Sequence, residues 1–226
     1  LGLAALILWH LDATPLASAR DSQFDRYQRH MPRNRDAEPV IVIGIDSESL
    51  LRHGQWPWSR NLMADLLDRI HAGQPLAIGL DIVFAEPDQY SPDQIARRLP
   101  DLTSGLRQTL PDPDQRLANA LNGRPTVLAT IGLANALPGA RHPTTPLPAL
   151  SAPPGIIEAL PKFVSAMNSM PLLEKAAGSS GLINASPDNP DSASERGILR
   201  RVPSLAHVGG HPYLSLPLEM VRTALG

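Results

Sequence analysis

Two apolar runs on either side of an amphipathic segment dominate the hydrophobic pattern of the first half of the chain. Residues 40–45 (VIVIGI) form an unbroken run rich in β-branched side chains, which is typical of a strand buried on both faces. Ser59 then precedes a helical stripe of apolar residues, Gly73 supplies its stop, and residues 76–84 form a second apolar run. This order predicts two parallel strands joined by a right-handed helical crossover.

The rest of the pattern predicts an α/β fold with a mostly parallel open sheet, flanking helices, a long proline-rich insertion, and a C-terminal strand pair followed by a helix. Helices are expected at residues 15–31, 92–98, 113–121, 170–177 and 215–225, and strands at 126–133, 181–185 and 198–208. Residues 134–161 are rich in proline and show no periodicity, which predicts an irregular surface loop.

The chain begins with an apolar run at residues 1–11 (LGLAALILWHL). A bilayer requires about twenty such residues, so this run is too short to span one. We favour the end of a truncated transmembrane helix at residues 1–14, followed by a single extracytoplasmic domain at 15–226. The alternative is a buried amphipathic helix.

Composition excludes several classes of protein. The chain has 226 residues, 20 basic and 22 acidic, and this near balance shows no basic patch that would indicate a nucleic-acid partner. It has no cysteine, which excludes disulfides, thiolate nucleophiles and thiolate metal sites. Glycine-rich phosphate loops, serine elbows and zinc-binding helices are also missing from the sequence, so we expect this chain not to be an enzyme.

The predicted parallel strands bring polar residues to one edge of the sheet, where ligands bind in open α/β folds. We expect a ligand site there formed by Asp46, Ser47, Trp56, Trp58, Arg60, Asp81 and Glu86. No cofactor is expected.

Each of these residues also has a purely structural interpretation. Asp46 and Asp81 could bind a divalent cation through oxygen ligands, or they could cap backbone turns. For Trp56 and Trp58 we favour packing over ligand stacking, since large rings dominate core energetics. For Arg60 we favour a structural ion pair with Asp46 or Asp81 over binding of an anion.

The motifs around these residues resemble a known family of sensor domains. Residues 44–50 (GIDSESL), 54–60 (GQWPWSR) and 79–88 (GLDIVFAEPD) are similar to the CHASE sensor family, type two, the cyclase/histidine-kinase-associated sensory extracellular domains. Further similar pieces follow in the same order: an acidic-led helix at 112–121, a glycine–asparagine strand at 181–184, a glycine–apolar–arginine segment at 197–201 and a helix start at 213–216. Where the family usually has Asp-Gly before the arginine segment, this chain has Arg196-Gly197.

The resemblance implies the periplasmic or extracellular input domain of a membrane-bound bacterial receptor. Such a receptor would bind a small molecule or protein signal, act as a homodimer, and pass the signal through its terminal helices to an intracellular cyclase or kinase. Two alternatives come from the residues themselves. One is a metal-dependent hydrolase that uses Asp46, Asp81 and Glu86 or Asp88, and the other is a structural module for oligomerisation.

Overall fold

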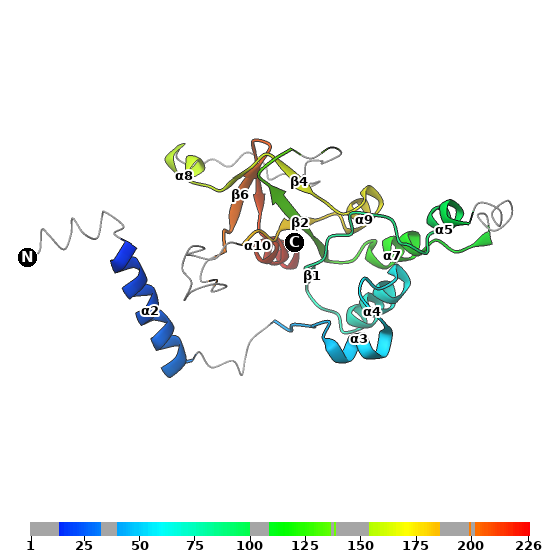
Figure 1. The fold of residues 1–226 in the computed structure, drawn as a ribbon, viewed down its shortest axis with the longest axis horizontal. Helices are drawn as coiled ribbons and strands as arrows, with labels where there is room; N and C mark the ends of the chain where they lie inside the picture. Colours follow the sequence, from blue (N-terminus) through cyan, green and yellow to red (C-terminus); the bar gives the residue numbers. More distant parts are fainter. Residues whose placement is uncertain are drawn as a thin grey trace, which may run out of the picture. The chain divides into compact units, whose positions relative to one another are not determined.

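The computed structural model describes residues 14–32, 40–99, 109–136, 138, 154–185, 199 and 202–226 (Figure 1). The chain divides into two compact units, Leu1–Arg52 and His53–Gly226. Residues 1–13, which carry the predicted transmembrane end, lie outside the described residues. Among the helices that are described, none is both long and apolar enough to cross a bilayer. The single domain at 15–226 stays a prediction.

The first unit contains helix α2 (Thr14–His30), which confirms the helix expected at residues 15–31. Helix α3 (Ser47–His53) begins in this unit and was not among the predicted helices, although Asp46 and Ser47 suit either an Asx turn or a helix N-cap. Its start is explained by Asp46, whose Oδ1 accepts the backbone N–H and the hydroxyl of Ser49 at 2.9 and 2.7 Å. The residue therefore acts as a helix cap.

The strand predicted at residues 40–45 is wrong. This segment is neither helix nor strand, and Ile41 and Val42 are each 87% exposed. The predicted parallel pairing with residues 76–84 fails with it. β-Branched residues favour a strand only where a neighbouring strand supplies backbone partners, and none of the described strand pairs includes this run.

The second unit is built around a mixed sheet. Its strands are β1 (Ile78–Leu80), β2 (Thr126–Leu133), β4 (Ser165–Met167) and β5 (Ser180–Leu182). Strand β2 pairs in parallel with β1 and β5 and antiparallel with β4. The strand expected at 126–133 is confirmed, and its almost continuous burial matches a central strand. Strand β1 contains only three residues of the run at 76–84, and β5 contains only two of the five residues predicted at 181–185.

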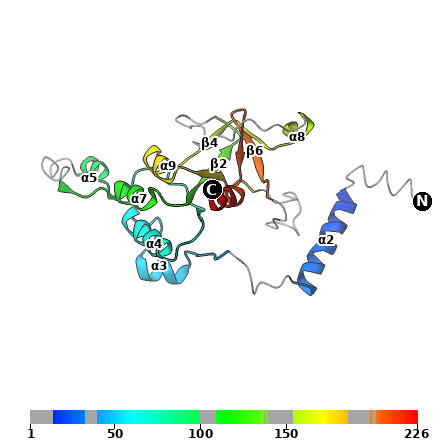
Figure 2. The same ribbon diagram turned by 180° about the vertical axis from the view of Figure 1, so that it is seen from behind.

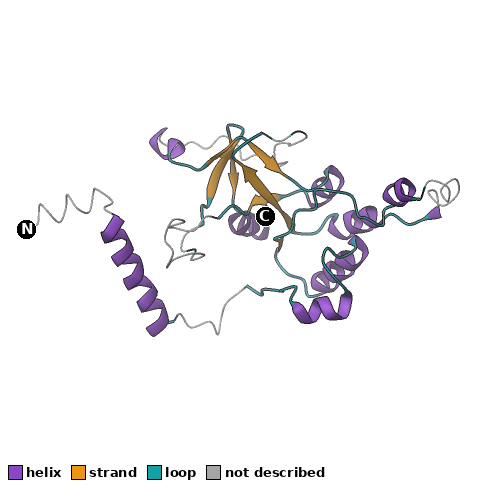
Figure 3. Cartoon of the chain, viewed as in Figure 1, coloured by secondary structure: helices purple, strands orange, loops and turns teal. Residues whose placement is uncertain are grey.

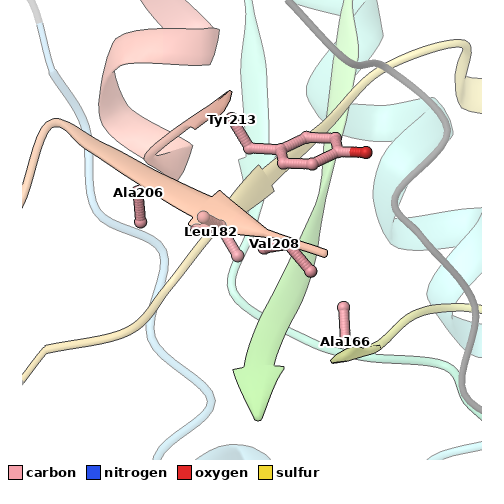
Figure 4. Close-up of a cluster of buried hydrophobic side chains, with 5 residues drawn as sticks. All are labelled: Ala166, Leu182, Ala206, Val208 and Tyr213. Carbon is pink, nitrogen blue, oxygen red and sulfur yellow. The ribbon is translucent and has the colours of Figure 1, made fainter. Parts of the chain in front are cut away.

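A second, smaller sheet contains β3 (Lys162–Phe163), β6 (Leu205–Val208) and β7 (His211–Leu214). Strands β6 and β7 form a hairpin whose two turn glycines have positive φ values, at Gly209 and Gly210. The ring of Tyr213 covers a buried cluster formed by Ala166, Leu182, Ala206 and Val208 (Figure 4). Helix α10 (Leu216–Leu225) follows this hairpin and confirms the helix expected at residues 215–225. The start at Tyr213 that the resemblance implied is wrong, because the hairpin continues to Leu214.

The described helices of this unit are α4 (Arg60–Ala72), α5 (Pro92–Arg98), α7 (Pro113–Leu121), α8 (Pro154–Glu158), α9 (Pro171–Ala177) and α10 (Leu216–Leu225) (Figure 3). Helices α9 and α10 pack against the main sheet. Helices α4 and α7 lie side by side, and α9 lies beside α7 (Figures 1 and 2). The helices expected at 92–98 and 113–121 are confirmed. Helix α8 corrects the expectation that residues 134–161 are irregular throughout.

Helix α10 packs against β1, β2 and β5 of the same unit. Its first residues approach β5 so closely that a Cβ on Gly181 would lie 2.6 Å from the Cα of Leu216. A Cβ on Gly79 of β1 would meet the side chain of Met220. Glycine at these two positions therefore lets the C-terminal helix rest directly on the sheet.

Candidate functional site

The loop that precedes α4 contains the tryptophan pair that the sequence singled out. Trp58 is only 7% exposed, and its Nε1–H donates to the carbonyl oxygen of Gly54 at 2.8 Å. Trp56 is 43% exposed, and its ring centroid lies 6.1 Å from that of Trp58, across a cis peptide bond between Trp56 and Pro57. The ring of His53 meets Trp58 edge-on at 5.5 Å. Trp58 therefore packs the loop, while Trp56 presents an aromatic surface to solvent.

Arg60, the first residue of α4, lies directly behind this loop and is largely buried. Its guanidinium lies 4.5 Å from the ring centroid of Phe84, and its Nη2 donates to the carbonyl oxygen of Glu86 at 3.0 Å. Its Nε lies 3.6 Å from Oδ1 of Asp114, an ion-pair distance beyond hydrogen-bonding range. The structural ion pair expected for Arg60 is thus made with Asp114 rather than with Asp46 or Asp81.

Two carboxylates that face Arg60 hold the loop after β1. Asp88 accepts the backbone N–H of Arg60 at 2.5 Å and that of Tyr90 at 2.7 Å. Asp114 accepts the backbone N–H of Asp88. Both acids are only 3% exposed. We call Arg60, Asp88 and Asp114 the buried charge cluster.

Burial sets the protonation properties of this cluster. Desolvation raises the pKa of Asp114 above its ordinary value, although the hydrogen bond from Asp88 and the charge of Arg60 act in the opposite direction. Burial also lowers the pKa of Arg60, against the charges of Asp114 and Asp88. Two carboxylates and one guanidinium therefore share a poorly solvated space, in which the charge of Arg60 opposes the rise in the pKa of Asp114.

The structure brings together only part of the predicted site. Four of the predicted residues make contacts in two pairs: Trp56 with Trp58, and Arg60 with the backbone of Glu86. Asp81 is exposed one residue beyond the end of β1. Asp46 and Ser47 belong to the other unit, where they form the start of α3, and the hydrogen bond from Ser49 lowers the pKa of Asp46. A ligand role for any of these residues remains a prediction.

Asp114 was missed as a partner of Arg60. A signal for it was present in the sequence, because Asp112 and Pro113 mark the start of a helix and place Asp114 in its first turn. Asp112 caps α7 by accepting the backbone N–H of Asp114 at 2.9 Å. The sequence shows that acids lie at this helix start, but it does not show that they turn toward α4.

The glycine–asparagine motif of the resemblance has a clear structural role. The side chain of Asn184 accepts the backbone N–H of Gly132 at 2.6 Å and donates to its carbonyl oxygen at 2.9 Å. The side chain of Asn184 therefore continues the pairing of β5 with β2 past their last backbone hydrogen bond, from Ile183 to Thr130. The arginine motif at 197–201 falls almost entirely outside the described residues.

A hollow of about 390 Å³ lies at the opposite end of the strands from the tryptophan loop. Its lining includes Asp68 and His71 of α4, and Arg124 from the turn before β2. None of the predicted site residues lines it. Within the described part of the chain, no group of three or more His, Cys, Asp or Glu side chains could hold a metal ion.

The fold and the site define an α/β domain whose buried charged residues stabilise a tryptophan loop and whose C-terminal helix rests on the sheet. The family model of the CHASE2 domain matches residues 1–226, the whole chain. The chain therefore belongs to the CHASE2 domain family, a family of sensory extracellular domains. No curated protein and no solved structure matches the chain.

Proposed function

We propose that this sensory domain is the periplasmic input domain of a membrane-bound bacterial receptor and that its signal binds on the tryptophan loop. The observation that carries the proposal is the exposed ring of Trp56, which is backed by the buried Trp58 and the buried charge cluster. An exposed aromatic ring on a well-packed base provides binding area without the cost of ordering a flexible loop.

A route from this loop to the end of the domain supports the proposal. Asp88 and Asp114 connect the start of α4, which directly follows the tryptophan loop, to the loop after β1 and to the start of α7. Helices α4 and α7 pack together, and β1 follows α4 directly in the chain. A ligand that prefers one position of the loop would therefore bias the packing of these elements.

Helix α10 is the element that would receive this bias. Its Glu219 is buried and accepts the hydroxyl of Ser179 at 2.5 Å, next to the start of β5. Arg222 binds the same carboxylate through Nε at 2.9 Å and Nη2 at 2.5 Å. A shift of the sheet would thus be passed to the C-terminal helix, which we propose carries it toward an intracellular cyclase or kinase.

The test is thermal unfolding of the chain against a panel of divalent cations and small periplasmic metabolites. A compound that binds only the native state at a hundred times its dissociation constant stabilises it by about 2.7 kcal/mol. The shift must disappear in Trp56→Ala and persist in Tyr90→Ala, which removes another exposed aromatic ring of the same unit. A shift that survives Trp56→Ala would place the ligand elsewhere, and no shift with any compound would count against a small-molecule signal.

If a compound binds, amide hydrogen exchange with and without that compound tests the proposed route to α10. Protection of the α10 amides should change together with that of the tryptophan loop. In Glu219→Gln, which weakens the bonds to Ser179 and Arg222, the change at α10 should be smaller while binding is retained. Protection limited to the loop would overturn the proposed route.

A further inference from the structure

Apolar side chains of the first unit lack a core of their own. Among its described residues no side chain is buried. Eight of its large apolar side chains are at least half exposed, namely Phe24, Tyr27, Met31, Val40, Ile41, Val42, Ile43 and Leu51. In proteins most helical stability comes from packing of an apolar face against another surface rather than from intrinsic propensity. These exposed side chains are therefore available to pack against a partner.

Three of these side chains form a narrow stripe along α2 and the residue after it, Met31, whose backbone N–H donates to the carbonyl oxygen of Tyr27 at 2.8 Å. Phe24, Tyr27 and Met31 are 50%, 55% and 76% exposed, and they are separated by three and then four residues. This is the spacing of the a and d positions of a coiled coil. The other described side chains of the helix, from residue 19 to 30, are polar apart from one alanine. We call Phe24, Tyr27 and Met31 the α2 stripe.

From this pattern we infer that the α2 stripe pairs in parallel with the α2 stripe of a second copy of the chain. A face made of one narrow apolar row is self-complementary, as a two-fold interface between identical chains requires. A helix that lies on a membrane would instead carry a wide apolar face flanked by Lys and Arg. The parallel orientation rests on the proposed function, since receptors in one membrane share one direction.

The residues beside the stripe suit such pairing. With Phe24 at position a, Gln23 and Gln28 take the g and e positions that face each other across a parallel pair, so no like charges meet there. The preceding d position holds Arg20, whose guanidinium lies 3.5 Å from the carboxylate of Asp21. Two arginines and two aspartates would therefore balance each other in that layer. Charges at the remaining positions, including Arg26 and Arg29, lie on the outer face.

The first experiment is sedimentation equilibrium of the 226-residue chain over a range of concentrations. The wild type should show a monomer–dimer equilibrium, and Tyr27→Glu should weaken dimerisation at least tenfold. The matched control is Ser22→Glu, which adds the same charge on the outer face of α2 and should leave the equilibrium unchanged. Equal effects of the two variants, or a wild type that is monomeric at all concentrations, would overturn the inference.

Two further arms distinguish other partners. Ile41→Ser tests whether the exposed run at residues 40–43 is the interface. If Ile41→Ser abolishes the dimer and Tyr27→Glu does not, the assignment of the interface to α2 is overturned. Flotation with phosphatidylcholine–phosphatidylglycerol vesicles tests the membrane. Vesicle binding that depends on Tyr27 in a monomeric chain would also overturn it. None of these readouts uses a ligand, so they are independent of the proposed signal site.

Disulfide cross-linking reports the orientation, because the natural chain has no cysteine. Met31→Cys should form a disulfide-linked dimer with itself, as a parallel pair places the two copies of this residue opposite each other. Cross-linking only in a mixture of Met31→Cys with Arg20→Cys would indicate an antiparallel pair and would contradict the proposal. Far-ultraviolet circular dichroism of each variant checks that the fold is retained.

Discussion

The carboxylate of Asp114 accepts the backbone N–H of Asp88 with both of its oxygens, at 3.2 and 3.0 Å. Asp114 lies at the start of α7, and Asp88 in turn accepts the first N–H of α4. One buried acid therefore holds a second acid in the position where it caps a neighbouring helix. Arg60 supplies the positive charge that this arrangement requires, since a buried carboxylate without a partner is strongly destabilising.

Removal of the guanidinium tests this dependence. Arg60→Gln should lower the free energy of unfolding by about 3 kcal/mol, because it leaves two buried carboxylates without a cation. The measurement is urea unfolding at neutral pH. Arg69→Gln is the matched control, since Arg69 is exposed on the same helix, and its effect should stay within about 0.5 kcal/mol.

A double-mutant cycle shows whether the effect comes from the charges. Asp114→Asn keeps an oxygen that can accept the N–H of Asp88 but removes the charge. The combined Arg60→Gln and Asp114→Asn variant should therefore lose less stability than the sum of the single variants. Additive losses would mean that Arg60 acts through its packing on Phe84 rather than through the acids.

The two tryptophans should respond in opposite ways. Trp58→Ala removes a buried ring and its bond to Gly54 and should cost about 3 to 5 kcal/mol. Trp56→Ala removes a ring that is 43% exposed and should cost no more than about 1 kcal/mol. Urea unfolding followed by circular dichroism measures both. Similar losses for the two variants would show that Trp56 also serves the fold, which would weaken its assignment to ligand binding.

Local signals explain what could be predicted from the sequence. The helix at residues 113–121 has an aspartate cap, a proline in its first turn and an apolar face, and its predicted limits match α7. The strand at 126–133 is mostly apolar, and six of its eight residues are buried. In such segments the local pattern and the tertiary packing favour the same structure, so sequence alone was sufficient.

Pairing between distant segments explains what could not be predicted. The run at residues 40–45 has the composition of a strand, yet strand formation depends on a partner that composition does not identify. Strand β7 at His211–Leu214 lies outside the strand ranges predicted from the sequence, because its four residues are too few to show alternation. For the site, the sequence placed Arg60 beside acids but did not select Asp114, since that choice depends on how α4 packs on α7.

The close packing of helix α10 on the sheet gives a third prediction. Gly181→Ala would place a Cβ 2.6 Å from the Cα of Leu216, and backbone cannot yield as a flexible side chain can. We expect a loss of about 1 to 3 kcal/mol in the free energy of unfolding. Gly155→Ala is the control, because a Cβ there meets no atom within 4 Å. Its stability should be unchanged or slightly higher, and a comparable loss in both variants would contradict close packing of α10.

A surface ion-pair network gives the last prediction. Asp68 of α4 binds Arg116 of α7 and Arg124 before β2, each at 2.6 Å. The bond from Arg116, followed by that from Arg124, lowers the pKa of Asp68 below its ordinary value of 3.8. These side chains are more than a third exposed, so solvent screens the pairs, and Asp68→Asn should cost only about 1 kcal/mol at neutral pH and low salt.

The pH dependence of this loss has a definite sign. Because the folded state holds the proton of Asp68 less tightly than the unfolded state, the stabilisation is present above pH 3.8 and is lost as the pH falls through the lower folded pKa. The difference between wild type and Asp68→Asn should therefore shrink below pH 3.8, and it should also shrink at neutral pH in 1 M salt. The raised pKa of Asp114 changes stability with pH in the opposite direction. Asp114 is present in both proteins, so its contribution cancels when the stabilities of wild type and Asp68→Asn are subtracted. Urea midpoints measured from pH 7 down to the lowest pH at which both proteins fold provide the test, and a difference that is constant over pH and salt would show that Asp68 stabilises the fold by packing rather than by charge.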